Sequence, residues 1–236
     1  MFRNCRSAAL TFLMASFAAT SFAAPVFVQF SVTSPIYNIL GGGEFTGHIN
    51  GGSAISIFCD DYQNTTHTNP YAAYISDSTN YQLDTRFGAT ASTNFAFLAN
   101  AGITALDRYT MAGWLTTKYT FPTTPTADDL AIQTAIWTLL AQNGAPSKPN
   151  PGGNTVDQTK VNYWLTQATT LKTTNLAMFT TIQSELRIVT SADVAGAGNR
   201  YLSGQQEYLY LTPEPTTIVL AGCGLAALAF LRKRRA

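Results

Sequence analysis

Two apolar segments, one at each end of the chain, limit the part that can fold as a globular domain to residues 24–212. At the N-terminus, two arginines precede an apolar run over residues 8–19, and small residues follow it. This order of a basic, an apolar and a small-residue segment is typical of a secretory signal peptide. We expect residues 1–23 to be removed by cleavage between Ala23 and Ala24.

The C-terminal segment also has three parts in a fixed order. A motif of Pro213, Glu214 and Pro215 is followed by an apolar run over residues 216–231. A basic cluster ends the segment, with Arg232, Lys233, Arg234 and Arg235. The apolar run is shorter than the roughly 20 residues of a typical transmembrane helix, but snorkelling basic side chains and local bilayer thinning would let it span. Because such basic residues stay cytoplasmic, the preceding domain would lie outside, in agreement with the signal peptide.

These three parts, written PEP, a short apolar helix and RKRR, resemble the PEP-CTERM sorting signal of Gram-negative bacteria. The resemblance covers residues 213–236. It implies export by the secretion machinery, initial anchoring by the membrane helix, handling by an exosortase and cleavage near the motif. It also implies delivery to the cell envelope, the cell surface or the extracellular matrix. The alternative is a permanent single-pass anchor.

The charge of the chain is distributed unevenly. The net charge of the whole sequence is +1, but residues 24–212 carry 8 Lys and Arg against 12 Asp and Glu, a net charge of −4. The acidic central region lacks the basic stripe of a nucleic-acid-binding protein, so we expect no nucleic-acid partner.

Residues 24–212 predict one extracellular α+β domain, β-rich with a helical middle segment. Alternating apolar and polar residues predict a first strand that Pro35 interrupts. Further strands are expected at residues 44–50, 53–59, 74–83, 186–190 and 208–211.

Capping-box patterns predict the starts of two helices in the middle segment. The capping pairs are Thr104 with Asp107 and Thr126 with Asp129. We expect the second helix to end near Gln142, before an Asn-Gly pair and a proline, and a third helix to follow Asn154.

Cysteine usage raises the first question about chemistry. Cys5 lies in the signal peptide and Cys223 in the C-terminal helix, so Cys59 is the one cysteine of the central domain. Exported domains normally pair their cysteines. Three interpretations of Cys59 remain open: a buried apolar side chain, an intermolecular disulfide, or a covalent bond within the chain.

Helical spacing places Gln133 on one face with Leu130, Trp137 and Leu140, so its amide points inward. An unsatisfied buried amide costs about 1–3 kcal/mol. One interpretation is a glutamine with a local hydrogen bond. The other is that the Cys59 thiolate attacks the Gln133 carboxamide, releases ammonia and leaves a thioester.

Two short motifs around these residues resemble those of the Cys–Gln thioester domains of bacterial surface adhesins. The motifs are Phe58-Cys59-Asp60-Asp61 on an expected strand and Ile132-Gln133-Thr134-Ala135-Ile136-Trp137 on an expected helix. The resemblance spans residues 53–142. It implies that a nucleophile such as a lysine amine on a partner opens the thioester, becomes amide-linked to Gln133 and releases Cys59 as a thiolate.

The sequence gives no basis for a catalytic or metal site, and we expect neither an enzyme nor a cofactor. His48 and His67 fit no zinc pattern, and no GxSxG motif is present. Asp60 and Asp61 are the right residue type for a hydrolase pair or a calcium site, but adjacent aspartates in a loop are usually solvated.

Aromatic residues leave a different class of function open. Tyr62, Tyr71, Tyr74 and Tyr81 are candidates for a sugar-binding face, although such residues more often pack in a core. The alternatives to a covalent adhesin are therefore a non-covalent exopolysaccharide-binding or structural matrix protein and, as a third class, a secreted hydrolase.

Overall fold

The structure, a computed structural model, describes most of the central domain. The described residues are 24–39, 42–61, 66, 68–81, 85, 102–120, 124–140, 156–193 and 205–212. The expected signal peptide, the Pro-Glu-Pro motif, the C-terminal apolar helix and the basic cluster lie outside them. Within the described ranges, no helix combines the length and the apolar character needed to cross a membrane.

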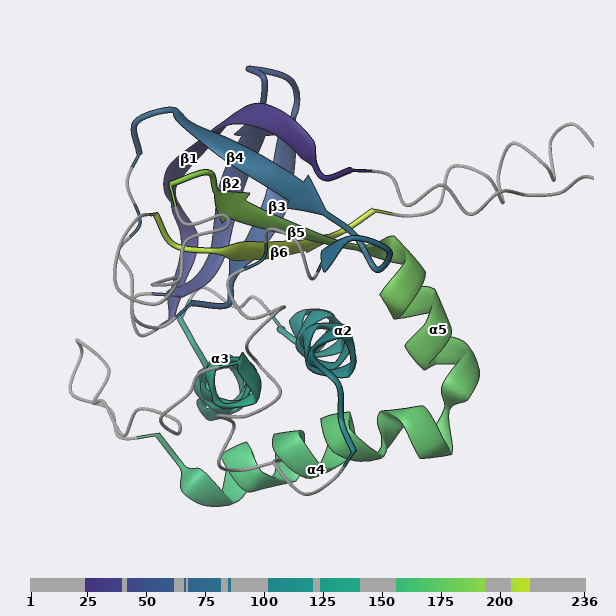
Figure 1. Ribbon diagram of the computed structural model, residues 1–236. Helices are drawn as coiled ribbons and strands as arrows, with labels where there is room; N and C mark the ends of the chain where they lie inside the picture. Colours follow the sequence, from purple (N-terminus) through teal and green to yellow (C-terminus); the bar gives the residue numbers. More distant parts are fainter. Residues whose placement is uncertain are drawn as a thin grey trace, which may run out of the picture.

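Six antiparallel strands close into a barrel in the order β1-β2-β3-β6-β5-β4 (Figure 1). Their bounds are β1 Val26–Ile39, β2 Gly42–Ile49, β3 Ala54–Cys59, β4 Tyr71–Ser76, β5 Leu186–Ser191 and β6 Tyr208–Leu211. The long strand β1 pairs with both β2 and β4 and so closes the barrel. The strands at both ends of the domain sequence therefore form one sheet, and the fold is α+β.

Two strands differ from the sequence prediction. Pro35 does not end β1, which continues to Ile39 with shifts of its register against β2 on either side of the proline. Such an irregularity accommodates a residue that lacks an N–H for the ladder. Strand β4 ends at Ser76, because Asp77 and Asn80 form a turn in which the Asp77 N–H donates to the Asn80 side chain.

Four helices are described between β4 and β5: α2 Ala105–Thr116, α3 Ala127–Leu140, α4 Gln158–Thr174 and α5 Leu176–Glu185. Both predicted capping boxes are confirmed. The third predicted helix, α4, is capped by Asp157. The sequence prediction missed α5, which begins where the Asn175 side chain accepts from the Met178 N–H. Helices α2 and α3 lie between one end of the barrel and α4 (Figure 1).

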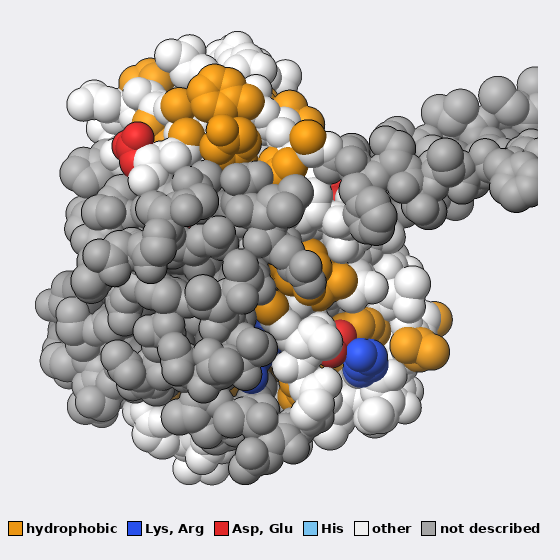
Figure 2. All heavy atoms as spheres, viewed as in Figure 1, with side chains coloured by type: hydrophobic (Ala, Val, Ile, Leu, Met, Phe, Trp, Pro, Cys, Tyr) orange, Lys and Arg blue, Asp and Glu red, His pale blue; other side chains and the backbone are white. Residues whose placement is uncertain are grey.

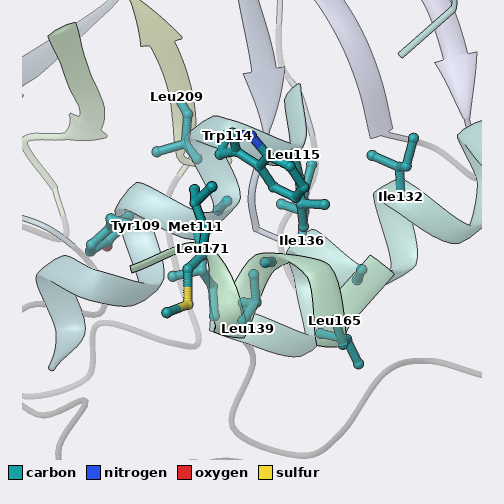
Figure 3. Close-up of a cluster of buried hydrophobic side chains, with 14 of the residues drawn as sticks. Tyr109, Met111, Trp114, Leu115, Ile132, Ile136, Leu139, Leu165, Leu171 and Leu209 are labelled. Carbon is teal, nitrogen blue, oxygen red and sulfur yellow. The ribbon is translucent and has the colours of Figure 1, made fainter. Parts of the chain in front are cut away.

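The core has two parts that meet at α3. One cluster lies among the helices, where Leu115 of α2, Ile136 and Leu139 of α3 and Leu165 of α4 pack together (Figure 3). The second cluster fills the barrel and includes Trp137 of α3. Helix α3 is therefore buried around its whole circumference from Asp129 onward, and not along a single stripe.

Among the described residues that Figure 2 colours, charged side chains are few and hydrophobic side chains gather over the barrel strands. Val26 and Phe27 at the start of β1 are exposed, and Phe27 makes an edge-on contact with Tyr74 of β4. The barrel thus carries apolar side chains on its outer surface as well as inside.

Asp129 fixes the start of α3 through hydrogen bonds to two threonines. Its carboxylate accepts from the N–H and hydroxyl of Thr126 and from those of Thr120. Burial alone would raise the pKa of Asp129, but these hydrogen bonds lower it below its usual value. Because the pKa is lowered on folding, the carboxylate stabilises the fold above its unfolded pKa.

We expect the free energy of unfolding to fall as the pH drops through the folded pKa of Asp129. Asp129→Ala should lower this free energy by about 1–3 kcal/mol at neutral pH, because several donors lose their acceptor. Denaturant titrations at neutral and acidic pH would measure both effects. An Asp129→Ala variant with the same steep acid dependence as the wild type would show that another group is responsible.

Candidate functional site

The two predicted thioester residues meet at the junction between the barrel and the helices. Cys59 is the last residue of β3, and Gln133 lies in the middle of α3. Side chains alternate along β3, so Ile57 and Cys59 join the barrel cluster while Phe58 packs against the helical cluster. Both Cys59 and Gln133 are 0% exposed.

The Gln133 carboxamide is held by three hydrogen bonds. Its Nε2 donates to the backbone oxygen of Cys59 at 2.9 Å. Its Oε1 accepts from the Gly43 N–H at 2.8 Å and from the Tyr119 hydroxyl at 2.8 Å. The side chain therefore contacts β2, β3 and the segment after α2 at once. The structure brings Gln133 against Cys59. The same hydrogen bonds also satisfy the buried amide, as expected for a glutamine with a purely structural role.

The Cys59 thiol is free and buried, and it donates to the Asp61 backbone oxygen at 3.4 Å. Burial raises the pKa of Cys59 well above its usual value, and the nearby Asp60 and Asp61 charges raise it further. Hydrogen bonds with the Trp137 side chain and the Asp61 backbone oppose this shift in part. These surroundings therefore favour the protonated thiol over the thiolate.

Gly42 and Gly43 bring β2 close to the Gln133 side chain. A Cβ on Gly42 would lie 2.6 Å from Trp137 Cζ2 and 3.1 Å from Gln133 Cδ. Gly43 has a φ of 95°, in the region that favours glycine, and its N–H reaches Gln133. Neither these glycines nor Tyr119 was predicted from the sequence to belong to the site. The predicted strand begins only at residue 44, so the available signal was the glycine run directly before it, since glycine at a strand can mark a close backbone approach.

Gly42→Ala is expected to lower the free energy of unfolding by about 1–3 kcal/mol, because the new methyl group overlaps the Trp137 ring. Chemical denaturation would measure the loss. Gly113→Ala is a suitable comparison, since the tightest contact of its Cβ would be the end of the Leu186 side chain at 3.1 Å, with Ile182 and Leu211 at 3.4 and 3.5 Å. If Gly42→Ala lost no more stability than Gly113→Ala, the result would contradict the close contact between Gly42 and Trp137.

The adjacent aspartates after Cys59 are not solvated as expected, because Asp60 and Asp61 are each only 1% exposed. They follow β3 into the junction, where the Asp61 backbone oxygen also accepts from Gln206 Nε2 at 2.7 Å. A third buried carboxylate, Glu207, accepts from the Tyr109 hydroxyl at 2.7 Å and from the Thr190 hydroxyl. Among the residues that the structure describes, no group of three or more His, Cys, Asp or Glu is arranged to hold a metal ion.

The tyrosines considered for sugar binding do not share one face. Tyr71 packs edge-on against the buried Phe30, whereas Tyr74 contacts the exposed Phe27. Tyr81 packs against the helical cluster, and Tyr62 lies outside the described residues. Of the two histidines, only His48 is described, and its Nδ1 lies 3.0 Å from the Gly52 backbone oxygen. His67 lies outside the described residues.

The family comparison locates a sorting signal at the C-terminal end of the chain. Residues 211–235 match the PEP-CTERM protein-sorting motif. No curated protein and no solved structure matches the chain. The match confirms the predicted PEP-CTERM resemblance, and it does not reach Cys59 or Gln133. The motif supports an exported protein that exosortase sorts, with delivery to the cell envelope or the cell surface.

Proposed function

We propose that the exported domain is a covalent adhesin whose Cys59 and Gln133 condense into an internal thioester. The observation that carries the proposal is the buried contact between the two residues, in which Gln133 Nε2 donates to the Cys59 backbone oxygen at 2.9 Å. Residues 74 positions apart in the sequence are thereby held together in a site where neither is exposed. Holding the thiol-bearing residue beside the carboxamide favours their reaction, because proximity of two reacting groups makes the step effectively unimolecular.

The condensation balances without a cofactor or a redox change. The Cys59 sulfur bonds to Gln133 Cδ, the bond from Cδ to Nε2 breaks, and the proton of the thiol leaves with the nitrogen as ammonia. Because the raised pKa keeps the thiol protonated, this proton is available for the leaving nitrogen. Burial also keeps bulk water from hydrolysing the product.

The thioester would be consumed once, so the domain acts as a tether and does not turn over. An amine on a partner attacks Gln133 Cδ, the bond from Cδ to sulfur breaks, and Cys59 receives the proton that the amine loses. The partner then remains attached through an amide. The PEP-CTERM sorting motif supports this role, because it implies delivery to the envelope or surface, where such a partner is encountered.

Methylamine labelling of the protein in its exported form tests the proposal. We expect methylamine to be incorporated at Gln133, with one Cys59 thiol becoming accessible to alkylation in the unfolded protein for each amine incorporated. Peptide mass spectrometry measures labelling at Gln133 and Cys59 separately, so that alkylation of Cys223 is not counted. The thioester is rejected if methylamine does not label Gln133 and if Cys59 of the unfolded protein is fully alkylated without any methylamine treatment. Binding to extracellular polysaccharide by such a protein would then favour the non-covalent matrix alternative.

A further inference from the structure

The Gln133 carbonyl oxygen has two hydrogen-bond donors that come from separate elements. The Gly43 N–H of β2 and the Tyr119 hydroxyl after α2 each lie 2.8 Å from Oε1. A carboxamide oxygen can accept two hydrogen bonds, so both of its acceptor positions are filled. Both donors are aimed at the one atom that gains negative charge when a nucleophile adds to Cδ.

We propose that Tyr119 and the Gly43 N–H form an oxyanion hole for the Gln133 carbonyl, with Tyr119 as a catalytic residue of thioester formation and opening. This inference rests on the proposed function. Attack by the Cys59 sulfur, or later by an amine, makes Cδ tetrahedral and moves an electron pair onto Oε1. When the tetrahedral state collapses, the pair returns to the carbonyl bond and ammonia or the Cys59 sulfur leaves. Donors already in place lower the energy of that state without reorganising.

The low-dielectric surroundings strengthen the effect of these donors. Gln133 is fully buried and Tyr119 nearly so. Burial raises the pKa of Tyr119 well above its usual value, with contributions from Cys59 and Asp129. The phenol therefore keeps its proton and remains a donor throughout the reaction.

Packing and hydrogen bonding hold Tyr119 in place. Its ring stacks on Phe58, the neighbour of Cys59, with centroids 5.7 Å apart and an angle of 8° between the planes. The next residue, Thr120, donates its N–H to Asp129 at the start of α3 at 3.0 Å. The segment that carries the hydroxyl is thus tied to both the strand of Cys59 and the helix of Gln133.

The second donor, the Gly43 N–H, is fixed by the backbone of β2. Gly43 adopts a φ of 95°, which a residue with a Cβ rarely adopts, and this conformation directs its N–H at Oε1. The third hydrogen bond, from Nε2 to the Cys59 backbone oxygen, fixes the rotation of the amide. The leaving nitrogen therefore lies on the Cys59 side of the carboxamide.

Tyr119→Phe in the exported protein tests the inference, since it removes the hydroxyl and keeps the ring that stacks on Phe58. We expect thioester formation and methylamine opening to slow by about 10²–10³-fold, the usual effect of losing one such donor. Tyr109→Phe is the matched control, because it removes a buried hydroxyl that bonds to Glu207 and not to Gln133. The control should form the thioester at the wild-type rate.

A second variant separates catalysis from support of the fold. Replacing Tyr119 alone by 3-fluorotyrosine makes the phenol a stronger donor with little change in shape, so methylamine opening should become faster. An unchanged rate with fluorotyrosine, or wild-type rates in a folded Tyr119→Phe protein, would overturn the inference while the thioester itself stands. Absence of methylamine labelling in the wild type would instead remove the proposed function, and with it the reaction that Tyr119 serves.

Discussion

Cys59→Ala is expected to abolish methylamine incorporation at Gln133 completely, because the variant has no sulfur to activate the carboxamide. The structure predicts that this variant still folds. Gln133 bonds to the backbone oxygen of Cys59, which alanine retains, and its other partners are Gly43 and Tyr119. Compared with wild-type protein whose thioester has been opened, removing one buried sulfur should change the free energy of unfolding by only about 1 kcal/mol.

The measurement compares amine incorporation at Gln133 in the wild type and in Cys59→Ala, with circular dichroism to verify the fold of both. The variant should also retain an unmodified Gln133 and release no ammonia during maturation. Equal labelling of the wild type and the variant would mean that Cys59 plays no part in the chemistry.

Trp137→Ala should cause the largest loss of stability, about 3–5 kcal/mol. Trp137 is almost completely buried, fills the end of the barrel cluster from α3 and lies against Gly42. Its removal leaves a cavity between the barrel and the helix that carries Gln133. We therefore expect the variant to lose thioester formation as well, because the carboxamide is no longer held against Cys59.

Trp164→Ala is the control for this prediction. Trp164 of α4 is only partly buried and packs against Trp114 and Tyr163 at the edge of the helical cluster. In chemical denaturation followed by far-UV circular dichroism, Trp164→Ala should lose clearly less free energy of unfolding than Trp137→Ala. Similar losses for the two variants would contradict the assignment of Trp137 to the junction of the two clusters.

The sequence predicts local features of the fold better than their arrangement in space. Both capping boxes are confirmed, because their hydrogen bonds join residues only three positions apart. Closure of the barrel depends on pairing between β1 and β4 and between β3 and β6, which no local pattern specifies. Helix α5 was missed, since its buried residues Phe179 and Ile182 make only a short apolar stripe.

The candidate site shows the same division. The motifs led to the prediction of Cys59 and Gln133 as a pair, and in the structure Gln133 Nε2 donates to the Cys59 backbone oxygen. The sequence did not identify Tyr119 or Gly43, whose roles depend on where the segment after α2 and the start of β2 lie relative to α3. Nor did it predict burial of Asp60, because a carboxylate after a strand is normally exposed to solvent.

Peptide mass spectrometry of the untreated, exported wild-type protein tests the central claim most directly. A thioester predicts a cross-linked pair of peptides, one containing Cys59 and the other Gln133, whose combined mass lacks one ammonia. Mild treatment with an amine should separate the pair and leave the amine on Gln133. Two separate peptides of full mass, with a free Cys59 thiol and an intact Gln133 amide, would contradict the account.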